Sequence, residues 1–324
     1  PLLKNVILGF MISQELNLNE FLTKAKSVNP EIKNLKSVIV SKEYAVKQAG
    51  KKINPVLELE AGNKEQLLGF FQDIEYPGKI DSRISIAKVE GEIADLNLRK
   101  YIRGLENALT SEYIEWYYSI EKQKIFEEYK NLISGIYSLS AYNYNQGFGY
   151  KLDLLKSKIE LNKANRFSAE AEKNSSQFLN KIIQSLQYSK TGLELFPSKV
   201  ELKDYLDLQE CYSLAELNNP DLQDSKLKIK LANIQKENVK LSSRPDFNLG
   251  LSAGLEDGKY VASLKFGMPL NLWDSKEDAL KESEYLTKGA EHESEVQLLN
   301  IKKEVSDAFI ETDKYRQLIM LFEN

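Results

Sequence analysis

Cysteine and histidine are almost absent from this sequence, which contains one of each in 324 residues. Cys211 alone cannot form a disulfide within the chain, and together with His292 it cannot supply the ligand sets of zinc or copper enzymes. We therefore expect neither a cofactor nor a metal site. Proline is also scarce, with 8 residues, which favours long helices and strands without interruption.

Long apolar runs and a strong excess of one charge are missing as well. After the first dozen residues the sequence has no run of about 18 apolar residues, so it offers no transmembrane helix. The formal net charge is −4, whereas binding to nucleic acid calls for a basic surface. We therefore expect no nucleic-acid partner.

No set of residues forms a recognisable catalytic pattern. Residues 147–149 (Gly-Phe-Gly) lack the third glycine and the following Lys-Ser/Thr of a phosphate-binding loop. His292 lies in a helical run among glutamates, which leaves no credible Ser-His-Asp triad. Paired carboxylates such as Glu58 and Glu60 are most simply solvated, with lumen charge that tunes cation passage as the alternative. We expect that the protein is not an enzyme.

The first residues have the pattern of a secretory signal. Lys4 precedes an apolar run at 6–12, and Ser13 follows this run. A first buried helical turn would give the same pattern. Since no cysteine follows the run, no lipoprotein acylation site is visible. We expect residues 1–16 to be a signal-peptide remnant or an N-terminal segment.

The rest of the chain repeats itself at an offset of 190 residues. Residues 29–32 (Asn-Pro-Glu-Ile) return as 219–222 (Asn-Pro-Asp-Leu), and the Pro-containing segment 54–59 returns as 244–249. This period is too long for a solenoid of short repeats, so it indicates two copies of one large unit.

Each copy changes pattern in the same order, from helix to hairpin to long helix. Pro30 and Pro220 stand at the first position of a predicted helix, where the missing N–H is harmless. We expect copy one at 17–200, with a helix at 30–52, a β-hairpin at about 55–76 and a long helical hairpin at about 79–189. We expect an incomplete copy two at 201–324, with a helix at 220–243, a β-hairpin at about 245–269 and a long helix to the C-terminus.

The hairpin segments alternate apolar and polar residues with period two. Asp257-Gly258 supplies the tight turn of the second hairpin. Such alternation is typical of a transmembrane β-barrel, although a soluble hairpin packed on a helix would also produce it. In the barrel, the lipid-facing residues would be Leu57, Leu59, Phe70, Tyr76, Phe247, Leu249, Leu251, Tyr260, Leu264 and Phe266. The lumen-facing residues would be Glu58, Glu60, Asp73, Glu75, Asn248, Ser252, Ser263 and Lys265.

After each hairpin the apolar residues switch to a spacing of three and four. Residues 78–139 contain no proline, and at 1.5 Å per residue they would form a helix of about 90 Å. A turn at 143–149 leads into a second long helix at about 152–189. Sustained spacing of this kind predicts packing against neighbouring long helices. The residues with this spacing in the first helix are Leu98, Ile102, Leu105, Leu109, Tyr113, Trp116 and Ile120.

The strands and the helices constrain the assembly. Four strands cannot close a barrel, because even small bacterial barrels have about eight, and an open edge in lipid leaves backbone groups unpaired. Three chains would supply twelve strands. We therefore expect a mainly α fold with β-hairpins, forming a homotrimer with a barrel continued by a helical tube.

The order of these motifs over 17–324 resembles the TolC-like outer-membrane efflux proteins, and within them the branch that serves heavy-metal and related cation pumps. The motifs are 29–32, the junction 48–55 (Gln-Ala-Gly to Asn-Pro), 76–83 (Tyr-Pro-Gly-Lys with Ser-Arg), 244–247 and the turn 144–155. The resemblance implies a trimeric duct in the outer membrane of a Gram-negative-type bacterium, made of a twelve-stranded barrel in outer-membrane lipid and a periplasmic helical tunnel.

The same resemblance implies the partners and the cargo. The duct would be a passive conduit for metal cations or small toxic compounds, joined by a periplasmic adaptor to an inner-membrane pump. Residues 190–210 would surround the waist of the tunnel. The residues of the helical tip that would contact the adaptor are Tyr144, Gly147, Asp153, Leu154 and Leu155. For Asp153, capping of the second helix is favoured over contact with the adaptor, since acidic residues are favourable near a helix N-terminus.

The sequence departs from this family at its end. Asn324 corresponds to Leu132 of copy one, so the second helical tip and its returning helix are not seen. We expect a C-terminally truncated chain. A type I protein-secretion duct with the same architecture, or a soluble coiled-coil scaffold, are the alternative functions.

Overall fold

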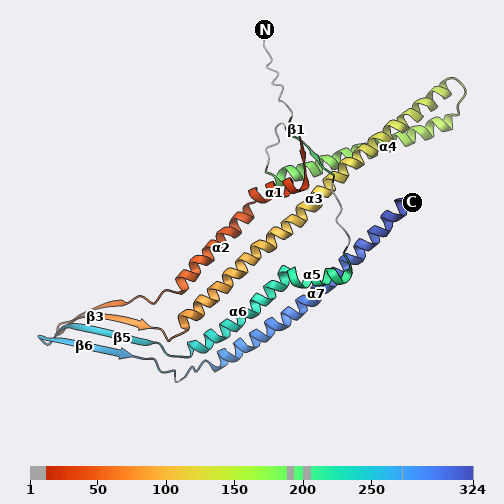
Figure 1. Cartoon of the computed structure of the whole chain (residues 1–324). Coiled ribbons are helices and arrows are strands. Elements are labelled where there is room, and N and C mark those ends of the chain that lie inside the picture. The colour runs from red at the N-terminus through yellow and green to blue at the C-terminus, as the bar shows by residue number, and fades with distance from the viewer. Residues whose placement is uncertain (1–11, 188–192, 200–205, 272, 324) are drawn as a thin grey trace, which may run out of the picture. The chain divides into compact units, whose positions relative to one another are not determined.

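The computed structural model describes residues 12–187, 193–199, 206–271 and 273–323. It is mainly α-helical, with two β-hairpins, as the sequence predicts (Figure 1). None of the helices in the described residues combines the length and the apolarity of a membrane span. In chain order the elements are β1 (Ile12–Leu16), α1 (Leu18–Val28), α2 (Pro30–Ala49), β2 (Val56–Ala61), β3 (Glu65–Ile74), α3 (Lys79–Asn145), α4 (Lys151–Ser185), β4 (Leu193–Pro197), α5 (Leu208–Asn218), α6 (Pro220–Ser242), β5 (Phe247–Glu256), β6 (Lys259–Gly267) and α7 (Glu277–Glu323).

The repeat is visible in the order of the elements, because α1-α2-β2-β3-α3 returns as α5-α6-β5-β6-α7. The Asn-Pro steps start α2 and α6. The side-chain oxygen of Asn29 accepts from the backbone N–H groups of Glu31 at 2.9 Å and Ile32 at 3.0 Å. Asn219 accepts in the same way from Asp221 at 2.8 Å. Each asparagine thus satisfies N–H groups that the first helical turn leaves open.

The helix bounds differ from the predicted ones in three places. Helix α2 ends at Ala49 instead of residue 52, since the N–H of Lys51 donates to the carbonyl of Gln48 and closes the last turn. Helix α3 continues to Asn145, beyond the predicted limit near 139. Helix α4 ends at Ser185, not at 189.

The chain divides into two compact units, and this division does not follow the repeat. Unit 1 contains the described residues up to Ile32 and those of 101–204, and unit 2 contains 33–100 and 205–324. Of the segment 1–16, residues 12–16 form β1 and the rest lie outside the described residues. Of the segment 190–210, residues 193–197 form β4, which pairs with β1 in parallel.

Unit 1 has its core where α1, α3 and α4 meet the β1–β4 pair. Tyr113 and Trp116 of α3 are fully buried, and their rings meet edge to face at 5.7 Å. The Tyr113 hydroxyl donates to the carbonyl of Leu16 at 2.7 Å and accepts from the N–H of Ser198 at 2.9 Å. Burial raises the pKa of Tyr113. Tyr113 therefore connects α3 to both β1 and the end of β4 by hydrogen bonds. The buried cluster is Leu16, Phe21, Ala25, Leu109, Tyr113, Trp116, Ile182, Leu186 and Leu195.

Unit 2 contains a four-stranded antiparallel sheet with the order β2-β3-β5-β6, so β2 and β6 form its edges. The helices joined to these strands follow the same order, α2-α3-α6-α7 (Figure 1). Ion pairs link each neighbouring pair of helices, Lys42–Glu90 at 2.8 Å, Lys230–Glu92 at 2.8 Å and Lys228–Glu293 at 3.8 Å. Unit 2 is thus a row of helices that continues a row of strands.

Candidate functional site

The register of the sheet sorts the strand residues onto two faces, because directly opposite residues of an antiparallel pair lie on the same face. Leu57, Phe70, Leu251 and Leu264 stand opposite one another in one row across all four strands. The predicted lipid-facing residues of the strands all share this apolar face, and Tyr76 follows the end of β3. On the apolar face lie Leu57, Leu59, Phe70, Phe247, Leu249, Leu251, Tyr260, Leu264 and Phe266.

The apolar face is strongly exposed. Leu59, Leu264 and Tyr260 are 78%, 73% and 92% exposed, respectively. A hairpin packed on a helix would bury such residues, so the exposure weighs against that interpretation of the alternation. Exposed apolar patches of this extent mark a surface that contacts a partner or a membrane.

The opposite face is polar. Asn248 donates through its side-chain amide to the carboxylate of Asp73 at 2.7 Å. The hydroxyl oxygens of Ser252 and Ser263 lie 2.7 Å apart, as a cross-strand hydrogen bond. The remaining predicted lumen-facing strand residues, Glu58, Glu60 and Lys265, lie on the same polar face.

Glu75 was predicted to be a charge facing the lumen, but it lies beyond the end of β3 and its side chain is only 7% exposed. Arg83 of α3 donates to it from both terminal guanidinium nitrogens, Nη1 and Nη2, with Nη2 at 2.9 Å from Oε2. The hydrogen bond with Glu75 raises the pKa of Arg83. Arg83 also donates to the carbonyl of Ala49 at 3.4 Å. Glu75 is therefore part of the strand-to-helix junction.

The carboxylate of Asp246 connects this junction to the second repeat of the chain. The Oδ1 atom of Asp246 accepts from the backbone N–H of Tyr76 at 2.7 Å and from Lys79 Nζ at 2.8 Å. Burial alone would raise the pKa of Asp246, but these hydrogen bonds outweigh burial and lower it. The sequence motifs at 76–79 and 244–247 are thus brought together by one side chain.

Phe71 has a role that its position in the sequence does not indicate. It lies on the polar face, opposite Gly250, with Gly69 two residues before it. A Cβ atom at Gly250 would come within 2.3 Å of the Phe71 ring, and one at Gly69 within 2.5 Å. The Lys265 Nζ atom lies 5.4 Å from the ring centroid. The ring therefore occupies space that a side chain at either glycine would fill. The contact with Gly250 is visible only once the strand register is known.

The tip between α3 and α4 exposes apolar and aromatic side chains. Gly147 has a φ of 80°, and the N–H of Phe148 donates to the carbonyl of Asn143 at 2.9 Å. Tyr144 is 39% exposed and Leu155 48%, whereas Leu154 is half-buried. Asp153 is exposed in the first turn of α4, after the cap residue Tyr150. Phe148 and Tyr150, 85% and 79% exposed, also belong to this tip but were missed, since only the structure shows their exposure.

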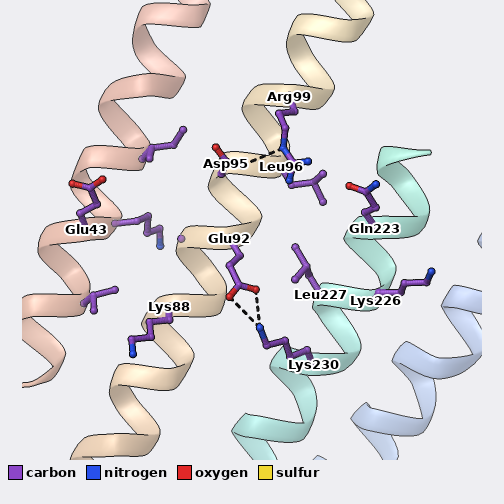
Figure 2. Close-up of a pocket in the computed structure, with 14 residues that line it drawn as sticks. Glu43, Lys88, Glu92, Asp95, Leu96, Arg99, Gln223, Lys226, Leu227 and Lys230 are labelled. Carbon is purple, nitrogen blue, oxygen red and sulfur yellow. Dashed lines mark hydrogen bonds and ion pairs between the residues drawn. The ribbon is translucent and has the colours of Figure 1, made fainter. Parts of the chain in front are cut away.

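A groove of about 740 Å³ lies between α2, α3 and α6 within unit 2 (Figure 2). Its walls carry charges of both signs, and several of these are paired. Lys230 contacts Glu92 at 2.8 Å, and Arg99 contacts Asp95 at 3.1 Å. This groove does not select a ligand of one charge. In the described part of the chain, no group of three or more His, Cys, Asp or Glu side chains is arranged to hold a metal ion.

No family model matches this chain, and no curated protein matches it. Solved structures do. The outer-membrane channel OprN is 15% identical, with a TM-score of 0.76 over 94% of this chain and 76% of that chain. The outer membrane protein VceC from Vibrio cholerae is 13% identical, with a TM-score of 0.74 over 94% and 81%. CusC, a structure described in terms of transmembrane channel formation, is 14% identical, with a TM-score of 0.65 over 93% and 75%. The chain therefore has the fold of these outer-membrane channels, as its resemblance to TolC-like proteins predicts.

Proposed function

We propose that this chain is one subunit of an outer-membrane exit duct, a passive conduit without catalytic activity. One observation carries the proposal. The four-stranded sheet has an exposed apolar face, a polar opposite face and two edges formed by β2 and β6. This is the arrangement of a barrel segment that separates lipid from a water-filled lumen. The shared fold with outer-membrane channels supports it.

Closure of the barrel requires further copies of the chain. The four strands alternate in direction, so β6 of one copy and β2 of the next copy would also pair as antiparallel strands. Three copies would give twelve strands and leave no open edge in the membrane, where each unpaired backbone group is costly. The apolar face would then contact outer-membrane lipid, and the polar face would line the lumen.

The long helices would continue the duct into the periplasm. There the tip between α3 and α4 would contact a periplasmic adaptor, and an inner-membrane pump would supply the energy. The exposed side chains of the tip support a docking role. The proposed contact residues are Tyr144, Gly147, Asp153, Leu154 and Leu155.

The charge on the polar face favours cations among the proposed cargo, which comprises metal cations and small toxic compounds. Acidic residues outnumber lysines on this face of the strands, and a lumen with an acidic surplus attracts cations and repels anions. The acidic residues are Glu58, Glu60, Glu65, Asp73 and Glu256, and the lysines are Lys259 and Lys265.

Membrane fractionation of bacteria that produce the full-length protein tests this function. We expect the protein in the outer-membrane fraction, extracted only with detergent, and migrating as an oligomer on gels until it is heated. A monodisperse monomer in the aqueous fraction would contradict the proposal and favour the scaffold alternative.

A further inference from the structure

We propose that charge at the two edges of unit 2 selects head-to-tail pairing between copies, with the glutamates of β2 meeting the lysines of β6 of a second copy. The inference rests on the proposed duct, and it goes further by naming the residues that decide how the copies join. The edge formed by β2 and α2 is called the first edge, and the edge formed by β6 and α7 is called the second edge.

The strand edges carry opposite charges on the polar face. Glu58 and Glu60 are exposed on β2, at the first edge. Lys259 and Lys265 are exposed on β6, at the second edge. Lys265 stands opposite Gly250 within its own chain, so no carboxylate occupies the position directly across from it, whereas Lys259 stands opposite Glu256 of its own chain. Its ammonium lies over the Phe71 ring, a contact that a carboxylate of a second copy can replace.

The outer helices repeat this complementarity with the signs reversed. Within unit 2, helix α2 (residues 33–49) at the first edge contains four lysines and one glutamate, and Lys42 among them is paired with Glu90 of the same chain. The first half of α7, residues 277–299 at the second edge, contains seven acidic residues and two lysines, and Glu293 among them is paired with Lys228 of the same chain. The first edge is thus basic along the helix and acidic along the strand, and the second edge is the opposite at both levels. Two independent layers therefore favour contact between unlike edges.

The same charges disfavour pairing between two like edges. If two first edges paired, glutamates would face glutamates, and if two second edges paired, lysines would face lysines. Like charges directly opposite each other destabilise a strand pair. Inward-pointing charges on edge strands are a known protection against wrong edge-to-edge association. Pairing of unlike edges is heterologous, and such contacts generate rings when the rotation closes.

The charges also limit the register. A slip of one residue between β6 and β2 would move Lys265 from the polar face to the apolar face, where a charge in lipid is costly. Registers that differ by two residues keep lysines and glutamates on the same face. The permitted pairings thus bring a lysine of β6 next to a glutamate of β2, directly or diagonally.

Charge reversal tests the proposal in the full-length protein. Glu58→Lys with Glu60→Lys reverses the first strand edge, and Lys265→Glu reverses the second without changing Lys259, which stands opposite Glu256 of its own chain. We expect each reversal alone to lower the fraction of heat-sensitive oligomer about tenfold. The reason is that the charges of β6 and β2 would then repel each other at each contact between copies. The triple variant that combines them restores unlike edges, and its oligomer should return to within about twofold of the wild type. Glu65→Lys with Glu256→Lys is the matched control for the first-edge reversal, since it makes the same change of charge on the two inner strands.

Zero-length carbodiimide cross-linking of the wild-type oligomer provides a second measurement that does not depend on folding of a variant. We expect peptides that join Lys259 or Lys265 to Glu58 or Glu60, and these should be confined to the oligomer band on a gel. Lys64 and Asp257 are the internal positive control, because Lys64 Nζ lies 4.0 Å from Asp257 Oδ1 within one chain. A wild-type oligomer without β6–β2 links, or edge reversals no more harmful than the control, overturns the charge selection but leaves the duct standing. A wild type that forms no oligomer overturns both.

Discussion

At the scale of single residues, the contacts that hold the sheet and its junction join segments far apart in sequence. Asp246 and Lys79 are 167 residues apart in the sequence, and Phe71 of the first repeat contacts Gly250 of the second repeat in the same chain. Neither relation leaves a signal in the spacing of one segment. Glu75 illustrates the same point. The alternation along the strand predicted that the Glu75 carboxylate faces the lumen. In the structure this carboxylate is paired with Arg83 of the following helix and is largely buried.

Gly250→Ala should destabilise the sheet by about 1–3 kcal/mol, because the added methyl group overlaps the Phe71 ring. The temperature at which the oligomer dissociates measures this effect. Phe71→Ala in the same chain should restore part of the loss, since the obstructing ring is gone. Gly254→Ala is the matched control. Its methyl group would lie 1.8 Å from the backbone carbonyl oxygen of Gln66, and Phe71→Ala should not rescue it. A neutral Gly250→Ala variant would contradict the ring placement.

Asp246 gives the junction a dependence on pH. Its pKa is lowered in the folded state, so its contribution to stability is present above the ordinary value of 3.8 and is lost as pH falls through the lowered value. Asp246→Asn should therefore destabilise the protein at neutral pH by about 1 kcal/mol, given the partial exposure of the carboxylate. It should also flatten the acid limb of a plot of dissociation temperature against pH. Asp257→Asn, at an exposed turn, should change neither, and equal effects of the two variants would refute this role.

At the scale of elements, the sequence predicts much because local rules decide much. Period-two alternation placed the strand residues on their faces in both hairpins, and the Asn-Pro steps marked the starts of α2 and α6. Helix ends were less predictable. Helix α2 stops at Ala49, and this depends on how the chain turns toward β2, which the pattern of the helix does not contain.

Asn219→Ala should weaken the start of α6 by about 1 kcal/mol, because two N–H groups lose their acceptor. Asn219→Ser keeps an acceptor and serves as the control. The two variants can be compared by hydrogen exchange of the first turn of α6. Equal protection in both would show that the cap contributes nothing.

The two faces of β6 should respond differently to the same substitution. Leu264→Lys puts a charge on the apolar face and should cost about 2–4 kcal/mol near the middle of a bilayer. Val261→Lys puts the same charge on the polar face and should be tolerated. The amount of oligomer recovered from the outer membrane measures both. Equal loss from the two variants would contradict the assignment of the faces.

At the scale of the whole molecule, the fold followed from the sequence because the repeat and the helical spacing extend over most of the chain. The division into units did not follow the repeat. Unit 1 takes its core from β1, β4 and the middle of α3, where Tyr113 binds both strands, and short strands of this kind are weak signals in a sequence. The assembly into a closed barrel is an inference from strand edges and exposed faces.

Solvent accessibility along β6 in membranes distinguishes an apolar face in lipid from one buried in protein. Single cysteines at positions 260 to 266, in a Cys211→Ser background, would be treated with a water-soluble maleimide and with a lipid-confined reagent. We expect strict alternation, with the positions of Tyr260, Leu264 and Phe266 reached from lipid and those of Val261, Ser263 and Lys265 reached from water. Protection of the first set from both reagents would place the apolar face in a protein core and contradict the proposed barrel.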